Sequence, residues 1–313
     1  MKLHNGIFAG LVMISFTACV TRTVYVSQPP PPDQQVYTPA PQPVAPPPTA
    51  YQQQQQVAPP PQPYQQPQPQ VAPPPQPQQA APVGYDQFYN ELAPYGQWVN
   101  YGNYGYVWIP AAGANFVPYS TAGHWEYTDN GWMWVSEYQW GWAPFHYGRW
   151  EFDAFYGWFW IPGNEWAPAW VSWRNCNGYY GWAPLGYGCG WDCNNVPESR
   201  FVFVNAQYIN DPYVYNHYEP RDHYHDYYTR SNFINRNHYD QDNRVTYNGG
   251  PEPTEASRYT GSVISPVHIN PAPKPGQSYN SNGGIEIYRP HVNAPQTNAP
   301  QPAPRNVVDM KQV

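Results

Sequence analysis

Residues 147–160 of this 313-residue chain read YGRWEFDAFYGWFW. The pattern inside this stretch, a Gly-x-Trp opening followed by a second Trp nine or ten residues later, occurs three times. The copies open at Gly96, Gly123 and Gly148, so the period is 27 and then 25 residues. A period of this size is typical of stacked supersecondary units that cannot each bury a hydrophobic face alone. We therefore expect the copies to fold only together.

Each copy predicts a β-hairpin, because two short aromatic or β-branched runs flank a cluster of turn residues. In the middle copy the runs cover residues 125–127 and 132–135, and residues 129–131 (Asp-Asn-Gly) lie between them. Asn and Gly adopt the positive φ angles that a tight hairpin turn requires. Side chains alternate across a strand, so Trp132 and Trp134 are expected to share one face.

A fourth hairpin is indicated by residues 170–173 and 180–182, which flank the turn residues Asn177 and Gly178. Aliphatic residues are scarce in residues 85–204, and all fifteen Trp of the chain lie in this range. Trp and Tyr must therefore supply most of the buried apolar area. The sequence predicts an all-β fold, in which antiparallel Trp/Tyr-rich hairpin repeats form one compact head over residues 85–204.

The first 18 residues predict a lipoprotein signal peptide. Their apolar run, residues 7–16, is too short to span a bilayer. Small residues directly before Cys19 resemble the bacterial lipoprotein processing site, so we expect cleavage after Ala18 and acylation of Cys19, with membrane lipid as the partner. An ordinary secretory signal that happens to contain a cysteine is the alternative.

The segment that follows, residues 19–84, is predicted to be a disordered stalk. Residues 28–83 are dominated by Pro and Gln, and their only charged residue is Asp33. Such a composition cannot bury a core and favours a solvated polyproline II chain. At about 3.1 Å per residue, it would hold the head on the order of 100 Å from the lipid.

The order of motifs between residues 88 and 204 resembles a Trp/Tyr-rich bacterial envelope lipoprotein family known only as a domain of unknown function. The resemblance implies a secreted or lipid-anchored β-rich module in the cell envelope, and it offers no catalytic residues. Val20 and Thr21, directly after Cys19, carry no aspartate retention signal, which favours the outer membrane if the host sorts lipoproteins by that rule. The motifs that carry the resemblance are YGQWV (95–99), YGYVWIP (104–110), GWMWVS (131–136), WGWAPFHYGRW (140–150), YGWFWIPG (156–163), EWAPAWVSW (165–173) and YGWAPL (180–185).

Trp and Tyr side chains carry polar groups at their tips, so we do not expect all of them to be buried in the core. Exposed rows of Trp and Tyr would suit extended polymers as ligands. Sugars have apolar C–H faces and polar edges, so envelope or extracellular glycans are the expected ligands. The alternative is that the rings are simply the core and that the head is a structural scaffold. The candidate stacking residues are Trp132, Trp134, Trp142, Trp158, Trp160 and Trp182.

The charge balance of the head excludes one class of partner. Residues 85–204 contain ten Asp and Glu against three Arg and no Lys, a net charge of −7. Such a balance repels nucleic acid and anionic lipid surfaces. We therefore expect no nucleic-acid partner.

The same carboxylates allow an alternative hypothesis, a glycan hydrolase. Such an enzyme needs two carboxylates about 5 to 10 Å apart across a sugar cleft, and Glu126, Glu151 and Glu165 are the candidates. No nucleophile, base and orienting group occur at a recognisable spacing, and alternation with Trp is typical of a solvated face. We expect a protein that is not an enzyme and has no catalytic residues.

Cysteine usage agrees with an exported chain. With Cys19 acylated, Cys176, Cys189 and Cys193 allow one internal disulfide. Cys189 and Cys193 can close a local loop, although Cys176 could pair with either. No Cys-x-x-Cys ligand pair is present, which argues against zinc.

Residues 205–248 form an extension rich in Tyr, His and Asn. Its histidines, His217, His223, His225 and His238, allow a second alternative, a metal-binding module for Zn, Cu or Ni. No paired spacing supports a closed site, so neither a metal site nor a cofactor is predicted.

The last segment, residues 249–313, is rich in Pro and Asn and is predicted to be mostly disordered. Two strand-like pieces stand out, at residues 263–269 and 285–288. These pieces can pair with each other or extend the edge of the head sheet.

Overall fold

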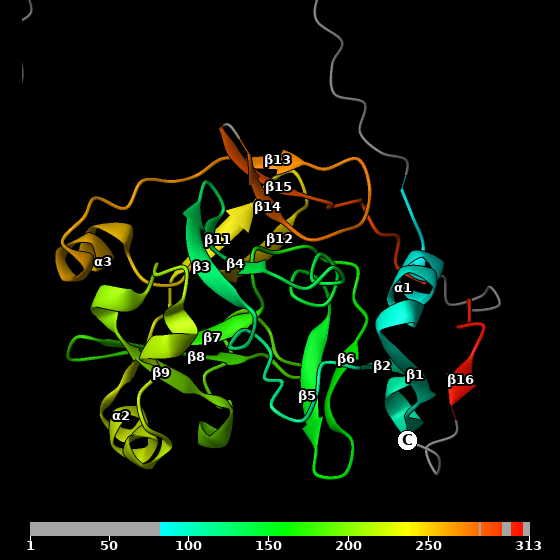
Figure 1. Cartoon of the computed structure of the whole chain (residues 1–313), viewed down its shortest axis with the longest axis horizontal. Coiled ribbons are helices and arrows are strands. Elements are labelled where there is room, and N and C mark those ends of the chain that lie inside the picture. Colours follow the sequence, from blue (N-terminus) through cyan, green and yellow to red (C-terminus); the bar gives the residue numbers. More distant parts are fainter. Residues whose placement is uncertain (1–81, 282, 296–301, 309–313) are drawn as a thin grey trace, which may run out of the picture. The chain divides into compact units, whose positions relative to one another are not determined.

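The structure, a computed structural model, describes residues 82–281, 283–295 and 302–308. The signal peptide, Cys19 and nearly all of the Pro/Gln segment lie outside the described residues. The predicted all-β class is confirmed, since the described chain is built mainly of antiparallel strands with three short helices (Figure 1).

The largest sheet has the strand order β16-β1-β2-β6-β5, and a second sheet has the order β10-β7-β8-β9. A separate hairpin pairs β3 with β4, and two small sheets, β11-β12 and β13-β15-β14, complete the set. The strands are β1 (Gly96–Asn100), β2 (Tyr106–Pro110), β3 (Gly123–Thr128), β4 (Gly131–Ser136), β5 (Arg149–Asp153), β6 (Gly157–Ile161), β7 (Val171–Cys176), β8 (Tyr179–Pro184), β9 (Val202–Asn205), β10 (Asn232–Phe233), β11 (Asn237–Asp240), β12 (Val245–Asn248), β13 (Ile269–Pro271), β14 (Tyr279–Ser281), β15 (Gly284–Ile287) and β16 (Val307–Val308).

All four predicted hairpins are present, as β1-β2, β3-β4, β5-β6 and β7-β8. Each hairpin places one Trp of its first strand directly opposite one Trp of its second strand. Aromatic residues directly opposite each other on neighbouring strands stabilise a sheet by contact across the ladder. The spacing of nine or ten residues in the sequence is therefore the length of a hairpin that brings two indoles into register. The four pairs are Trp98 with Trp108, Trp125 with Trp134, Trp150 with Trp160, and Trp173 with Trp182.

The glycine of each Gly-x-Trp opening has a steric reason. A Cβ atom on Gly123 would lie 2.6 Å from the Val135 carbonyl oxygen and 2.7 Å from the Trp134 ring. A Cβ atom on Gly96 would likewise lie 2.7 Å from the Trp108 ring, and one on Gly148 would lie 2.7 Å from the Trp160 ring. The second indole of each copy therefore packs directly against a backbone position that carries no side chain.

The core is made of these rings. Thirteen of the fifteen Trp residues are buried, and only Trp158 and Trp191 are partly exposed. The Trp125 ring, for example, lies 4.5 Å from the Trp173 ring and 5.5 Å from the Trp182 ring, measured between centroids. Several buried indoles also donate a hydrogen bond to a backbone carbonyl: Trp108 to Leu92, Trp132 to Pro251, Trp150 to Pro144, Trp160 to Tyr147, Trp170 to His146, and Trp182 to Tyr119.

Three helices lie outside the sheets: α1 (Tyr85–Leu92), α2 (Tyr224–Arg230) and α3 (Pro253–Thr260). Short 3₁₀ turns connect the strands: η1 (Ala93–Tyr95), η2 (Gly102–Tyr104), η3 (Glu198–Arg200), η4 (Ala206–Tyr208), η5 (Val214–His217) and η6 (Arg221–His223). In the part of the chain that the structure describes, no helix has the length and apolarity needed to cross a bilayer.

The compact unit extends further than the sequence predicts. Residues 249–281 and 283–295, expected to be mostly disordered, form α3 and the sheet β13-β15-β14 instead. Both alternatives for the strand-like pieces are realised, because Ile269 pairs with Ile285 in parallel and Val267 forms an isolated parallel bridge with Thr128 at the end of β3. Ile269 and Ile285 belong to the same buried cluster as the Trp core. The prediction of disorder rested on the Pro-rich composition. Proline lacks an N–H, but its carbonyl can still accept hydrogen bonds from buried donors, so a Pro-rich segment can be part of a packed domain.

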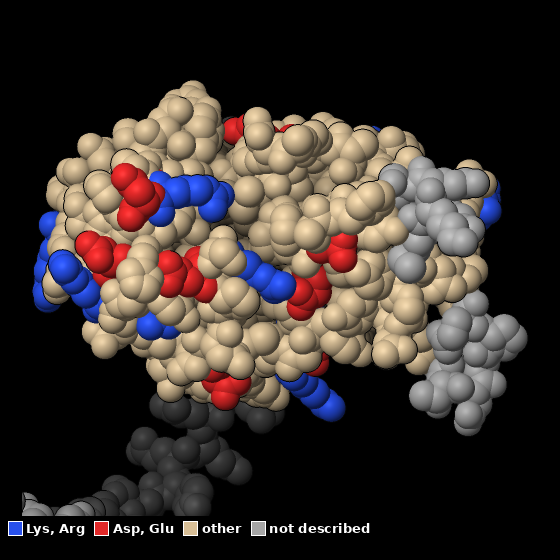
Figure 2. Space-filling view, turned by 90° about the horizontal axis from the view of Figure 1, so that it is seen from below, with Lys and Arg blue, Asp and Glu red and all other residues tan. Residues whose placement is uncertain are grey.

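The surface carries few charges. Figure 2 shows one face on which Lys, Arg, Asp and Glu side chains are scattered among a large uncharged area. The whole chain contains 14 Lys and Arg against 21 Asp and Glu. Any local excess of positive charge is therefore unusual for this molecule.

Candidate functional site

The structure corrects most of the predicted stacking residues. Five of the six, Trp132, Trp134, Trp142, Trp160 and Trp182, have almost no exposed surface. A ring that is packed on both faces cannot stack on a ligand, so these five are core residues. Of the six, only Trp158 keeps an exposed part.

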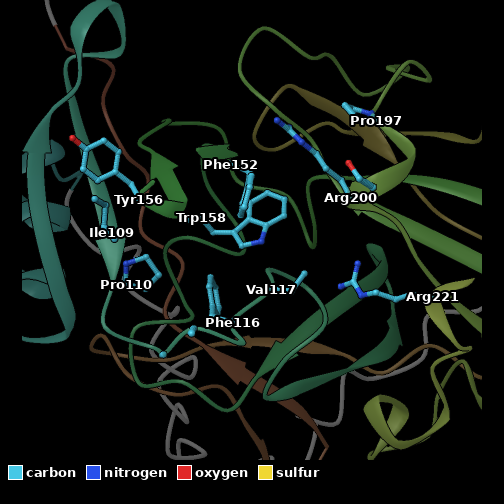
Figure 3. A pocket seen from close by; sticks show the side chains of 14 residues that line it. Ile109, Pro110, Phe116, Val117, Phe152, Tyr156, Trp158, Pro197, Arg200 and Arg221 are labelled. Carbon is cyan, nitrogen blue, oxygen red and sulfur yellow. The ribbon is translucent and has the colours of Figure 1, made fainter. Parts of the chain in front are cut away.

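Three cavities in the described part of the chain concern the candidate residues, and Trp158 lines the first, which has a volume of about 730 Å³ (Figure 3). We call it the Trp158 cavity. Its wall is formed by the end of β2, the loop that follows β2, the β5-β6 hairpin, η3 and η6. The lining residues are Ile109, Pro110, Gly113, Ala114, Phe116, Val117, Phe152, Tyr156, Gly157, Trp158, Pro197, Ser199, Arg200 and Arg221.

One side of the cavity is aromatic. Phe152 on β5 stands directly opposite Trp158 on β6, and the two ring centroids are 5.4 Å apart at an interplanar angle of 66°. Phe152 is 52% exposed. The pairing of β2 with β6 is at Trp108 and Trp160, and Pro110, the last residue of β2, lines the cavity beside Trp158.

The other side of the cavity is positively charged. Arg200 forms an ion pair with Glu151, and its guanidinium carbon lies 5.7 Å from the centre of the Trp158 ring. Arg221 is exposed and forms no ion pair with any described residue. In Figure 3 both arginines lie on the side of the cavity away from Tyr156. None of the described Asp and Glu residues lines this cavity.

A second cavity, of about 580 Å³, shares Val117 and Arg221 with the first. Its charged lining residues are Glu137, Glu219 and Arg221, and Tyr215 adds a ring that is 41% exposed. The two cavities therefore meet at Val117 and Arg221.

A third cavity, of about 390 Å³, is lined in part by Arg149. Burial lowers the pKa of this guanidinium to about 10. Its carbon lies 3.7 Å from the centre of the Trp170 ring, and its N–H groups donate to the carbonyls of Gly148 and Cys189. Arg149 is thus a packing residue, and two of its donors are already used by backbone carbonyls.

The three candidate carboxylates of a hydrolase do not share a cavity. Glu126 lines none of the three, and burial raises its pKa. Glu151 is engaged with Arg200 and also accepts the backbone N–H of Tyr187. Glu165 is exposed and lines only the third cavity. No pair of these carboxylates flanks one of the cavities.

Cys189 and Cys193 form a disulfide, and Cys176 is a buried free thiol. The bridge closes a local loop whose first carbonyl, that of Cys189, accepts from Arg149. Cys19 lies outside the described residues.

The histidines of the extension have separate partners. His217 stacks on Tyr208 with 3.8 Å between ring centroids, and His225 lies 3.1 Å from a carboxylate oxygen of Glu198. His223 contacts Tyr227, and His238 stacks on Tyr247. Among the described residues, no three His, Cys, Asp or Glu side chains come together in a way that could hold a metal ion.

Sequence reasoning missed most of the residues that line the Trp158 cavity. Phe152 could have been found, because it stands opposite Trp158 once the hairpin register is drawn. Arg200 and Arg221 could not, because they reach the cavity from a different part of the chain. His146 was missed as well. It is fully buried beside Trp166, and burial lowers its pKa to about 4, so it is neutral near pH 7.

No curated protein and no solved structure matches this chain. The four hairpins and the aromatic side of the Trp158 cavity lie within residues 89–189, whereas Arg200 and Arg221 lie beyond them. Those residues, 89–189, match the sequence profile of a family of unknown function, DUF6600.

Proposed function

We propose that the described domain is a non-catalytic glycan-binding module of the cell envelope, and that the Trp158 cavity is its binding site. The observation that supports this is the pair of partly exposed rings, Phe152 and Trp158, in a cavity of about 730 Å³. Binding sites for small molecules are concave and mostly apolar, with a few polar groups that fix orientation. This cavity has that composition.

Sugars suit this cavity better than other ligands do. A pyranose ring has an apolar C–H face that packs on an indole, and its hydroxyl edge needs donors and acceptors such as Ser199 and Arg200. Nucleic acid is a poor candidate, because residues 85–204 have a net charge of −7. The thirteen buried Trp residues build the framework that holds the two rings in place.

The experiment is a titration of the full-length chain with peptidoglycan fragments and soluble polysaccharides. Trp158→Ala should weaken binding of the recognised glycan by about 2 kcal/mol, roughly 30-fold in Kd, because truncating a central Trp removes most of the contact area at that point. Trp fluorescence can follow the titration of the parent chain. Trp158→Ala removes the indole that would report on the cavity, so its binding should be measured by calorimetry.

Trp191→Ala is the matched control, because Trp191 is also partly exposed but lines none of the three cavities. It should bind like the parent chain, and both variants should unfold at the parent temperature. If no polymer gives a saturable response, or if Trp158→Ala binds as well as Trp191→Ala, the head is a scaffold and the proposal is wrong.

The anchoring part of the proposal rests on residues 1–19, whose pattern predicts a lipoprotein signal and acylation of Cys19. Cys19→Ser should move the chain from the membrane fraction to the soluble fraction of expressing bacteria, because the acyl chains supply the affinity for the bilayer. Immunoblotting of the two fractions measures this. An unchanged distribution would show that another feature holds the protein at the membrane.

A further inference from the structure

The Trp158 cavity and the second cavity share lining residues, Val117 and Arg221, so they adjoin on the surface. Their volumes are about 730 and 580 Å³. A ligand that fills both must be longer than one or two sugar units. The inference below rests on the proposed function and specifies the chemistry of the glycan.

We call the two adjoining cavities together the groove. Charged residues are unevenly distributed along it. Among the described residues that line the Trp158 cavity, only Arg200 and Arg221 are charged. The second cavity adds Glu137 and Glu219 beyond Arg221. Because Glu151 compensates Arg200, Arg221 is the unpaired charge of this cavity among the described residues, and an unpaired positive charge is unusual in a chain whose net charge is −7.

Arg221 is available to a ligand. It forms no ion pair with any described residue, and its guanidinium carbon lies 5.8 Å from the centre of the Tyr224 ring, which supports the side chain. A guanidinium has five N–H donors and no acceptor. Arg200 donates to Glu151 through Nη2 and keeps other donors. Planar, bidentate recognition of a carboxylate is the task for which arginine is best suited.

We propose that the groove binds a carboxylate-bearing glycan, with a carboxylate at Arg221 and the neighbouring sugar units in the two cavities. On one side a sugar face packs on Trp158 and Phe152. On the other side uncharged hydroxyls donate to Glu137 and Glu219. Because those two carboxylates repel negative charge, a chain in which acidic and neutral sugars alternate fits the groove better than one charged at every unit.

The probe is an octasaccharide of alternating glucuronate and N-acetylglucosamine, compared with the same octasaccharide after methyl esterification of its carboxylates. Esterification removes the charge and leaves the sugar rings unchanged. Calorimetry on the full-length chain should give a Kd for the acid form at least about tenfold lower than for the ester, the usual effect of a charge-assisted hydrogen bond. The corresponding disaccharide should bind more weakly, since it cannot reach both cavities.

Arg221→Gln should abolish the preference for the acid form, whereas the ester should bind the variant and the parent alike. Arg230→Gln is the control, because Arg230 is also exposed and lines neither cavity. It removes the same charge and should keep the preference.

Two results would overturn this inference: equal affinity for acid and ester, or an acid preference that survives Arg221→Gln. If the parent binds both forms equally and Trp158→Ala binds neither, the glycan site stands and only the carboxylate assignment fails. If neither the octasaccharides nor any neutral glycan binds, the proposed function and this inference both fail.

Discussion

At the scale of the residue, this core differs from an aliphatic one because its main building block carries a donor. The indole N–H of Trp182 donates to the Tyr119 carbonyl over 2.7 Å, although the ring is fully buried. Tyr119 in turn donates its hydroxyl to the Phe145 carbonyl and accepts the backbone N–H of Trp170. Buried polar groups of irregular loops are thus satisfied by side chains that also fill the core.

Not every buried indole has such a partner. The Nε1 atoms of Trp98, Trp125, Trp134 and Trp166 have no acceptor among the described residues. At these four positions the ring contributes through its faces and edges and not through a hydrogen bond of its N–H group. The same residue type therefore has two energetic roles in one core.

This difference gives a prediction for Trp125 and Trp182, whose rings are in contact at 5.5 Å and are both fully buried. Each Trp→Phe change removes the same atoms. Trp182→Phe should cost about 1 to 2 kcal/mol more free energy of unfolding than Trp125→Phe, because it also leaves the Tyr119 carbonyl without that donor. Urea unfolding of the full-length variants measures both costs. Equal losses would mean that this hydrogen bond contributes nothing net.

At the scale of the element, the hairpins could be predicted because their determinants are local. Asn177 and Gly178 have φ angles of 41° and 88°, the positive values that their types favour in a two-residue turn. Period-two alternation and turn residues fix a hairpin without knowledge of its neighbours.

The exposure of each ring could not be predicted in this way. Trp158 and Trp160 lie on the same face of β6, two residues apart, yet Trp160 is buried and Trp158 is partly exposed. The neighbouring strand differs at the two positions, because β2 pairs with β6 through Trp108 opposite Trp160, whereas next to Trp158 it offers only Pro110, which lines the open cavity. Alternation assigns a face, whereas burial also depends on which strand covers it. For the same reason, five of the six Trp residues predicted from the sequence to stack on a ligand are buried, and only Trp158 lines the cavity.

At the scale of the whole molecule, the Pro-rich segment that looked like a tail completes the domain. Val83 donates its N–H to the His291 carbonyl over 2.9 Å, and Asn293 donates to the Val83 carbonyl over 2.8 Å. The beginning and the end of the main described region are thereby joined. Tyr147 donates its hydroxyl to the Pro290 carbonyl, and Trp132 donates to the Pro251 carbonyl. The segment after residue 249 therefore supplies acceptors for core side chains, Trp132 and Tyr147, whose donors have no such acceptor within the hairpins.

A chain that ends at residue 248 should accordingly be much less stable than the full chain. It loses the buried Ile269, Ile285 and Ile287, each of which contributes about 1.5 to 3 kcal/mol when buried, together with the two proline acceptors. We expect its thermal midpoint to fall by more than about 10 °C, with a weaker near-ultraviolet circular dichroism signal from the Trp core. A chain that ends at residue 301 is the control, since it removes β16, which pairs with β1 at only two positions. If the chain ending at residue 248 unfolds at the same temperature as this control, the C-terminal segment is an appendage and the hairpins are sufficient for the fold.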